Sequence, residues 1–208
     1  MTDAGTYELG DEVYRASDMS VRVAWCRALA QHVAVRMINL DTVTTTVAEL
    51  QSHTKNMSSM SHENVLRYFV SFVTGHHLWI ITEYAACGPC AGVLGFIAQQ
   101  DESFIAALLH SVVRGIGYLH SREQLHRGIQ AENIFIHSDG RATLDVTAAS
   151  RNLIDSGDRK IAQTYVGTLQ WMAPEVMEQV GNYGAPADIW SLGESIRVPR
   201  QCDGNMSC

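Results

Sequence analysis

The chain of 208 residues changes the spacing of its apolar residues once, and this change constrains the fold more than any other feature. In the first part β-branched and polar residues alternate, which is typical of strands. The predicted strands lie at residues 7–13, 20–29, 32–40 and, as a hairpin around Gly75, 65–84, with one helix expected at 45–60. From Phe104 to His120 the apolar residues recur at intervals of three and four, which predicts an amphipathic helix. We therefore expect an α+β chain with a β-rich first lobe and a helical second lobe.

The composition limits the classes of function. A formal net charge of -7 argues against the basic surface that binds a phosphate backbone, so nucleic acid is not an expected partner. No apolar run approaches the roughly 18 residues of a membrane span. The acidic, polar N-terminus lacks the layout of a signal or transit peptide. We expect a protein without membrane contact that resides in the cytoplasm, with the nucleus as a second location.

Five motifs follow one another along most of the chain: VAVRMINL, HRGIQAEN, LDVT, VGTLQWMAPEVM and ADIWSLG. In this order and spacing they resemble the protein kinases, and their wording is most similar to the sterile-20 group and, within it, to the sterile-20-related adaptor pseudokinases. The resemblance covers residues 7 to about 193 and implies a bilobal protein-kinase-like fold. The implied parts are an N-lobe at 7–84, a hinge at 85–90, a partial and therefore truncated C-lobe at 91–196, and a disordered tail at 197–208.

The resemblance also locates the residues that would hold the phosphates of a nucleotide, and their chemistry has changed. Arg15, Ser17 and Ser20 stand where the glycine-rich loop has its glycines, which let a backbone approach a triphosphate. Arg36 takes the place of the lysine on the third strand; its planar guanidinium is no substitute for a compact ammonium group. His53 aligns with the glutamate that pairs with this lysine, so the usual ion pair cannot form.

The sequence that matches the catalytic loop lacks the residues that act in catalysis. Gly128 stands where kinases have the aspartate base, a loss worth roughly 10² to 10⁴ in rate, and Gln130 brings no charge where they have a lysine. Asn133 and Asp145 match the metal-binding positions, which leaves a residual site for ATP, with or without Mg²⁺, open. The candidate nucleotide-binding residues are Arg36, Glu83, Ala85, Asn133 and Asp145, and the candidate metal ligands are Asn133 and Asp145.

Other motif residues match positions that keep the shape of the fold. His126 and Arg127 belong to the architectural part of the catalytic loop, and Asp188 matches the carboxylate that holds its backbone. A further group would shape the wall that faces a bound peptide and is a candidate for partner docking: Gly167, Thr168, Ala173, Pro174 and Glu175.

The resemblance therefore implies a catalytically inactive adaptor. Adaptors of this family dock onto a liver-kinase-B type serine/threonine kinase and activate it, assisted by a helical-repeat scaffold protein. The expected docking surface is the cleft wall and residues 145–175. The family's scaffold-binding tail has no counterpart in this sequence.

Three alternatives stay open. Asn133, Asp145 and the Ala-Pro-Glu triplet favour a slow but active serine/threonine kinase of the sterile-20 group. The short helical lobe favours a non-functional or dominant-negative fragment that folds poorly. The C-x-x-C spacing of Cys87 and Cys90 favours a thioredoxin-like redox protein, whereas the intervening Gly and Pro favour a simple turn. Five scattered cysteines do not form a disulfide framework, so reduced thiols are expected.

Overall fold

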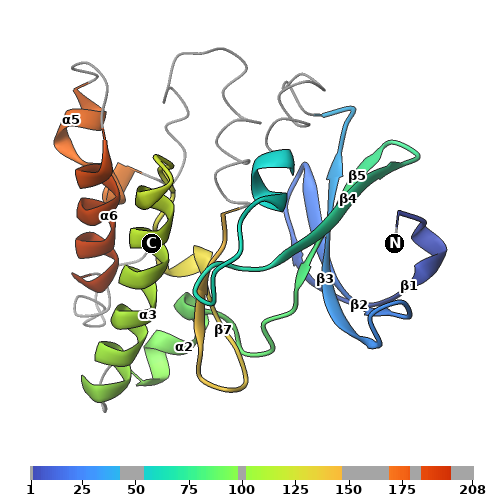
Figure 1. Cartoon of the computed structure of the whole chain (residues 1–208), viewed down its shortest axis with the longest axis horizontal. Helices are drawn as coiled ribbons and strands as arrows, with labels where there is room; N and C mark the ends of the chain where they lie inside the picture. The colour runs from blue at the N-terminus through green and yellow to red at the C-terminus, as the bar shows by residue number, and fades with distance from the viewer. Residues whose placement is uncertain (1, 43–53, 98–101, 147–168, 179–183, 198–208) are drawn as a thin grey trace.

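The computed structural model describes residues 2–42, 54–97, 102–146, 169–178 and 184–197. A β-rich lobe and a helical lobe lie at opposite ends of the longest axis (Figure 1). This arrangement confirms the bilobal α+β fold predicted from the sequence.

The β-rich lobe is one antiparallel sheet with the strand order β1-β2-β3-β5-β4. Its strands are β1 (Tyr7–Arg15), β2 (Met19–Cys26), β3 (Gln31–Asn39), β4 (Tyr68–Thr74) and β5 (His77–Glu83). β4 and β5 are joined by a tight turn at Gly75, whose φ of 55° suits a residue without a side chain. All five predicted strand segments are confirmed, with ends that differ by a few residues. Residues 54–58 are helical, which agrees with the end of the predicted helix at 45–60.

β3 has two faces with different roles. Val33 and Val35 are fully buried and join a cluster on one face of the sheet that also contains Trp79 and Ile81. Because side chains alternate along a strand, Ala34 and Arg36 lie on the opposite face. Ile38 also lies on this second face, where it packs in the core of the helical lobe.

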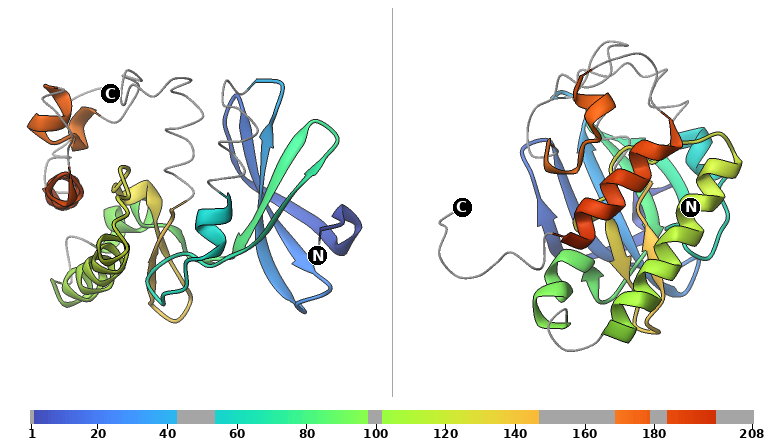
Figure 2. Two further views of the ribbon diagram at one scale, coloured as in Figure 1. Left: turned by 45° about the horizontal axis from the view of Figure 1, so that its top comes forward. Right: turned by 90° about the vertical axis from the view of Figure 1, so that its left-hand side faces the viewer.

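The second lobe begins with a small sheet of the order β6-β7-β8, which lies between the large sheet and the long helix α3 in Figures 1 and 2. Its strands are β6 (Gly88–Pro89), β7 (Ile134–Ile136) and β8 (Ala142–Leu144). The helices are α2 (Cys90–Ile97), α3 (Glu102–Ser121), α5 (Pro174–Met177) and α6 (Ala185–Arg197). Single 3-10 turns lie at Ala4–Thr6, Ala131–Asn133 and Leu169–Trp171. The sequence predicts a disordered tail from residue 197, but Arg197 is the last residue of α6. Residues 198–208 lie outside the described part.

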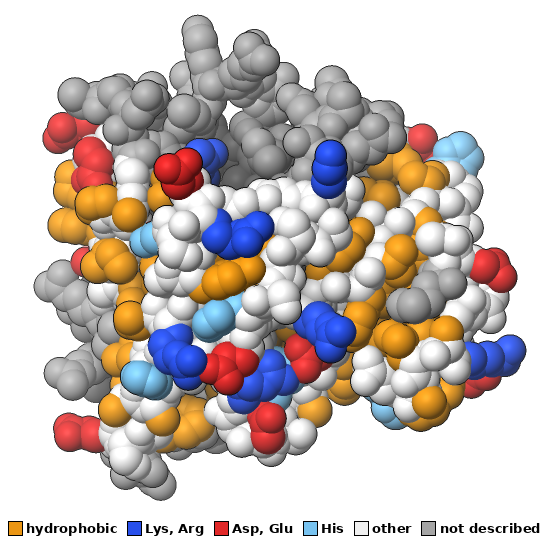
Figure 3. All heavy atoms as spheres, in the orientation of Figure 1, with side chains coloured by type: hydrophobic (Ala, Val, Ile, Leu, Met, Phe, Trp, Pro, Cys, Tyr) orange, Lys and Arg blue, Asp and Glu red, His pale blue; other side chains and the backbone are white. Residues whose placement is uncertain are grey.

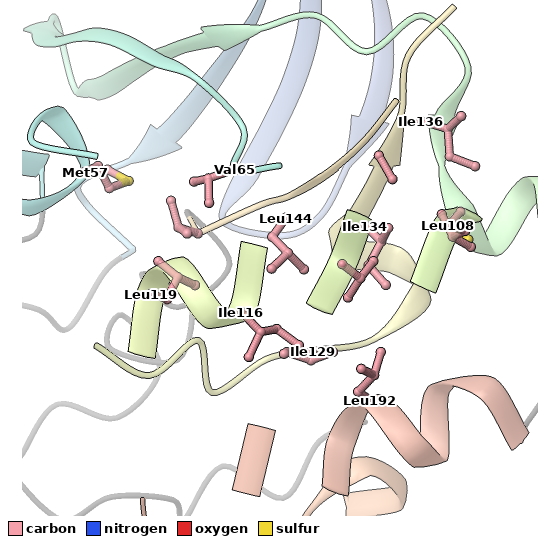
Figure 4. Close-up of a cluster of buried hydrophobic side chains, with 14 of the residues drawn as sticks. Met57, Val65, Leu108, Ile116, Leu119, Ile129, Ile134, Ile136, Leu144 and Leu192 are labelled. Carbon is pink, nitrogen blue, oxygen red and sulfur yellow. The ribbon is translucent and has the colours of Figure 1, made fainter. Parts of the chain in front are cut away.

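The core of the helical lobe forms around α3. Figure 4 shows side chains from α3, β7, β8 and α6 meeting in one cluster, among them Leu108, Ile116, Leu119, Ile134, Leu144 and Leu192. α3 lies close to Asn64 and to β8 at Gly115, where a Cβ would lie 2.6 Å from the Asn64 carbonyl oxygen and 2.9 Å from Cδ1 of Leu144. Val113 is one of the apolar residues at helical spacing between Phe104 and His120, and the prediction that it is buried is wrong. Val113 is 51% exposed, because the stripe that contacts β8 is narrower than the apolar stripe in the sequence.

The two lobes share this core. Ile38, Leu78 and Ile80 of the large sheet belong to the same cluster as α3, and Val65 connects them through a bridge to Leu144. The two lobes are therefore joined by continuous packing.

The surface carries mixed charge. On the face seen in Figure 3, Lys and Arg side chains lie next to Asp and Glu, in agreement with exposed ion pairs such as Arg114 with Glu63. Within the described ranges, no helix is long and apolar enough to cross a membrane.

Candidate functional site

The loop of residues 125–133 is held by one buried carboxylate. Asp188 of α6, which is 2% exposed, accepts hydrogen bonds from the backbone N–H groups of His126 at 2.9 Å and Arg127 at 2.8 Å. His120, at the end of α3, contacts the same carboxylate through Nε2 at 2.8 Å. Asp188 thus fixes the loop backbone to two helices of the C-lobe.

This anchoring maintains an unusual backbone and a buried imidazole. Arg127 adopts a left-handed conformation with a φ of 58°, which costs free energy in a non-glycine residue and persists only when the surroundings impose it. His126 is 1% exposed. Burial lowers the pKa of His126, although the nearby charges of Asp188 and Asp145 oppose this shift. At neutral pH the ring is therefore uncharged and contributes to the packing below the cleft.

The loop offers no group for proton transfer at the position of the kinase base. Gly128 is buried, and its carbonyl oxygen accepts a hydrogen bond from Nδ2 of Asn133 at 2.7 Å. Gln130 is half-buried, and its backbone carbonyl accepts from the N–H of Asn133 at 2.9 Å. Asn133 is thus used to shape the loop in which it lies.

Arg36 of β3 and Asp145, which follows β8, form an ion pair between the two lobes. The Arg36 Nη2 atom lies 2.6 Å from the Asp145 Oδ2 atom, and the two side chains are 15% and 2% exposed. The backbone N–H of Asp145 donates to the carbonyl of Asn133 at 2.9 Å. The sequence placed Arg36 and Asp145 in one candidate nucleotide site, but their direct contact was not foreseen. In protein kinases the basic residue of the third strand pairs instead with a glutamate of the N-lobe helix. His53, the counterpart of that glutamate, lies outside the described residues.

The two candidate ligands of Mg²⁺ each use one side-chain atom in a contact within the protein, and neither contact takes the amide oxygen of Asn133 or Oδ1 of Asp145. Magnesium takes carboxylate and other oxygen ligands in near-octahedral geometry. Asp145 directs an oxygen to the guanidinium of Arg36, and the amide nitrogen of Asn133 is engaged by Gly128. The part of the chain that the structure describes contains no group of three or more His, Cys, Asp or Glu side chains suited to a metal ion. A metal ion bound at Oδ2 of Asp145 would compete with Arg36 for this oxygen.

The β1–β2 connection is a tight hairpin. The N–H of Ala16 donates to the carbonyl of Met19 at 2.7 Å, which leaves Ser17 and Asp18 as the turn. Arg15 and Ser20 are directly paired across the strands just before it. The N–H of Asn39 donates to the Asp18 carbonyl at 2.9 Å and so ties the turn to β3. Arg15, Ser17 and Ser20, which stand where the kinase loop has glycine, all lie at this end of the hairpin.

At the hinge, Glu83 serves the structure through its side chain. Its carboxylate accepts a hydrogen bond from Nη2 of Arg141 at 2.7 Å, and His137 Nδ1 lies 3.8 Å from it. Arg141 also donates from Nη1 to the Glu63 carbonyl at 3.0 Å, so the β7–β8 turn holds the end of β5. The backbone N–H of Glu83 donates to the Arg67 carbonyl at 2.8 Å. Sequence reasoning missed Arg141 and His137; the Asp-Gly turn beside Arg141 was the available signal.

The other hinge candidate, Ala85, is 6% exposed, and its carbonyl accepts from the N–H of Gly88 at 3.0 Å. The nearby cysteines do not support redox chemistry. Cys87 and Cys90 are both free thiols, and Cys90 is buried. Burial, followed by the charge of Glu132, raises the pKa of the Cys90 thiol to about 11, whereas reactive cysteines need a lowered pKa.

The candidate docking residues are described only in part. Ala173 is buried, Pro174 is the exposed first residue of α5, and Glu175 is half-buried. Met177, at the end of the same helix, is 46% exposed. Gly167 and Thr168 lie outside the described residues, as does most of the segment between Asp145 and Ala173.

Residues 18–197 match the protein kinase domain family. The chain belongs to this family. Among its relatives, Germinal center kinase 3 of Caenorhabditis elegans is 35% identical over 207 residues, covering 92% of this chain and 35% of the relative. Serine/threonine-protein kinase fray2 of Dictyostelium discoideum is 36% identical over 193 residues, covering 91% of this chain and 19% of the relative. STE20-related kinase adapter protein alpha of Mus musculus is 29% identical over 204 residues, covering 93% of this chain and 47% of the relative. The chain thus spans less than half the length of each of these three relatives.

Proposed function

We propose that this kinase-domain chain is catalytically inactive and acts by binding a partner serine/threonine kinase and stabilising its active conformation. The observation that carries the proposal is Gly128. A hydrogen atom stands where a carboxylate would accept the proton of a substrate hydroxyl, and the Gly128 carbonyl is engaged by Asn133. Loss of a general base alone lowers a rate by about 10² to 10⁴.

The pairing of Arg36 with Asp145 supports the same proposal. Phosphoryl transfer depends on positioned positive charge at the phosphates and on metal ions held by carboxylate and amide oxygens. In this chain the cation and the carboxylate at these two positions neutralise each other. By the resemblance, Gly128, Gln130, Arg36 and His53 stand at positions that protein kinases use for this chemistry.

The partner class follows from the resemblance to the STE20-related adaptors, to which the mouse relative belongs by name. We propose a liver-kinase-B type kinase in the cytoplasm as the partner, with a helical-repeat scaffold protein as a second one. A ligand shifts a conformational equilibrium only by its difference in affinity for the two conformations. The chain would therefore contact a surface of the partner that changes on activation, through the wall that Ala173, Pro174 and Glu175 help to form.

The test is a reconstituted activation assay. The purified partner kinase phosphorylates a peptide, and the rate is measured as the chain is added. We expect the rate to rise. Met177→Asp should raise the concentration of the chain needed for half-maximal activation about tenfold, because a charge would replace an exposed apolar side chain at the contact. Val73→Asp on β4 is the matched control, since Val73 is 61% exposed and lies on the other lobe. A folded wild-type chain that leaves the partner's rate unchanged would refute the proposal.

A second candidate function is a slow serine/threonine kinase. Two relatives named as kinases share 35% and 36% identity with the chain, and Asn133 and Asp145 are kept at the metal-binding positions. ATP with Mg²⁺ would then be the cofactor. The two functions differ in one observable, which is phosphoryl transfer that depends on Asp145.

A further inference from the structure

We propose that Ser59 is a site of serine phosphorylation, and that Arg122 binds the phosphate and thereby fastens the loop after the helical residues 54–58 to the end of α3. This site goes beyond the proposed function and does not depend on it, because it concerns a contact between the two lobes. In the modification, Oγ of Ser59 attacks the γ-phosphorus of ATP bound to another kinase. The Oγ–P bond forms, the bond from the γ-phosphorus to the β,γ-bridging oxygen breaks, ADP leaves, and the hydroxyl proton passes to the base of that kinase.

Ser59 lies in an exposed turn. The helical residues 54–58 end directly before it, and residues 60–62, which follow, have no regular secondary structure. Both Ser59 and Arg122 are exposed to solvent. The hydroxyl is therefore within reach of another enzyme, and no helix has to unfold around it.

Arg122 is already placed to receive a phosphate on this serine. Its Nη2 atom donates a hydrogen bond to Oγ of Ser59 at 3.3 Å. The guanidinium carbon lies 5.7 Å from the centroid of the Tyr118 ring, which is a cation–π contact. The Tyr118 hydroxyl in turn accepts from the N–H of Ser61 at 2.9 Å. Because the arginine is positioned before the modification, less side-chain entropy is lost when it binds the phosphate.

Phosphorylation turns a weak contact into a strong one. The present hydrogen bond is long and joins a neutral hydroxyl to a hydrated cation, so it contributes little. A phosphoserine carries about -1.5 to -2 charges and three acceptor oxygens, and a guanidinium can bind two of them at once. One hydrogen bond is lost, since the hydroxyl now donates to the Asn56 carbonyl at 2.8 Å. That carbonyl keeps the N–H of Ser59, which donates to it at 3.1 Å.

The loop around Ser59 already connects the two lobes. Gln124, which follows α3, donates to the side-chain oxygen of Asn56. The His62 ring stacks on the Tyr118 ring with centroids 4.8 Å apart. A phosphate held by Arg122 therefore adds a charged link to an existing junction.

Two acidic residues near in the sequence weigh against a phosphate. Glu63 is paired with Arg114 at 2.6 Å, so its charge is compensated. Glu123 follows Arg122 and is exposed, and water and salt screen its repulsion. The attraction of Arg122 acts at hydrogen-bond distance from Ser59 and outweighs these effects.

Ser58 is the matched neighbour. It is also exposed, and its hydroxyl donates to the Lys55 carbonyl at 2.7 Å. It is the last helical residue, and the partial negative charge at the C-terminal end of a helix opposes a phosphate. The two adjacent serines should therefore respond to phosphorylation in opposite directions.

The experiment compares the full chain with phosphoserine placed at position 59 or at position 58 by site-specific incorporation, each in the wild type and in Arg122→Gln. Urea denaturation gives the change in midpoint that each phosphate causes. We expect phosphoserine at 59 to raise the midpoint by up to about 0.5 M and Arg122→Gln to abolish this rise. Phosphoserine at 58 should lower the midpoint in both backgrounds.

A second measurement on the same samples reports the contact itself. In ³¹P NMR, the second pKa of a phosphoserine, which is about 6 without a partner, falls when a cation binds the dianion. This pKa should be lower at position 59 than at position 58, and Arg122→Gln should remove the difference. Equal pKa values at both positions of the wild type, or a rise in midpoint that survives Arg122→Gln, would overturn the role of Arg122.

Use of the site is measured on the full chain expressed in eukaryotic cells in the presence of a phosphatase inhibitor. Tandem mass spectrometry should find phosphate on Ser59 at a higher fraction than on Ser58. No phosphate on Ser59 in a sample whose other cellular proteins are phosphorylated would overturn the assignment, and so would a higher fraction on Ser58. None of these results involves the activity of a partner kinase, so the adaptor function stands or falls separately.

Discussion

Replacing Asp145 by Asn should destabilise the chain by about 3 to 5 kcal/mol. The two side chains have nearly the same volume, so the change removes the charge without leaving a cavity. Arg36 is 15% exposed and would keep its positive charge after losing the Asp145 carboxylate. Removing one partner of a buried ion pair costs this much because the remaining charge still lacks the hydration it has in the unfolded state. The same effect would loosen the contact between the lobes.

The assay is urea denaturation followed by tryptophan fluorescence. With a slope near 2 kcal/mol/M, the expected loss moves the midpoint by roughly 2 M. Glu63→Gln is the matched control: Glu63 pairs with Arg114 at 2.6 Å, but the side chains are 54% and 51% exposed. A surface pair of this kind contributes about 0 to 1 kcal/mol, so its midpoint should hardly move.

A double variant completes the cycle. Arg36→Met together with Asp145→Asn removes both charges, and replacement of a whole buried pair is often neutral. Most of the stability lost in Asp145→Asn should therefore return. If Asp145→Asn costs no more than Glu63→Gln, the pair is not a buried interaction in solution.

Three further predictions follow from the packing. Gly115→Ala should cost about 1 to 3 kcal/mol in urea denaturation, because its Cβ would clash with a backbone oxygen, whereas Gly117→Ala in the same helix meets nothing within 4 Å and should stabilise by up to about 1 kcal/mol; equal effects would contradict the packing of α3. Asp188→Asn should cost at least about 2 kcal/mol, since two backbone N–H groups lose a charged acceptor, and a smaller loss would show that the loop is held otherwise. Burial lowers the pKa of His126 and of His137, so the unfolded chain binds more protons than the folded chain below about pH 6.5. The free energy of unfolding should therefore fall as the pH drops from 7.5 to 5.5, by up to about 1.4 kcal/mol per pH unit for each group. A variant with Gln at both positions that shows the same pH slope as the wild type would contradict this.

Periodicity predicted the parts of the fold that depend on local physics. Alternation fixed the strands around Arg36, and helical spacing fixed most of the buried face of α3, since each pattern depends only on neighbours along the chain. Val113 was misplaced because the width of an apolar stripe in the sequence does not show how much of it another element covers.

The site could be predicted where a residue's place in a sequence motif implies its role. The bonds that Asp188 makes to the loop backbone were expected from the resemblance to protein kinases, in which the matching carboxylate holds the backbone of the catalytic loop. Contacts between lobes could not be anticipated. The Arg36–Asp145 pair spans 109 positions and the Glu83–Arg141 pair 58, and no local pattern selects such partners.

The central claim is that the chain binds and does not transfer phosphate. The most direct measurement is incorporation of radiolabelled phosphate from ATP into a general protein substrate and into the chain itself, with Mg²⁺ or Mn²⁺, for the wild type and Asp145→Ala in parallel. We expect both proteins to give the same background incorporation. Incorporation by the wild type that Asp145→Ala abolishes would contradict the claim and identify a working kinase.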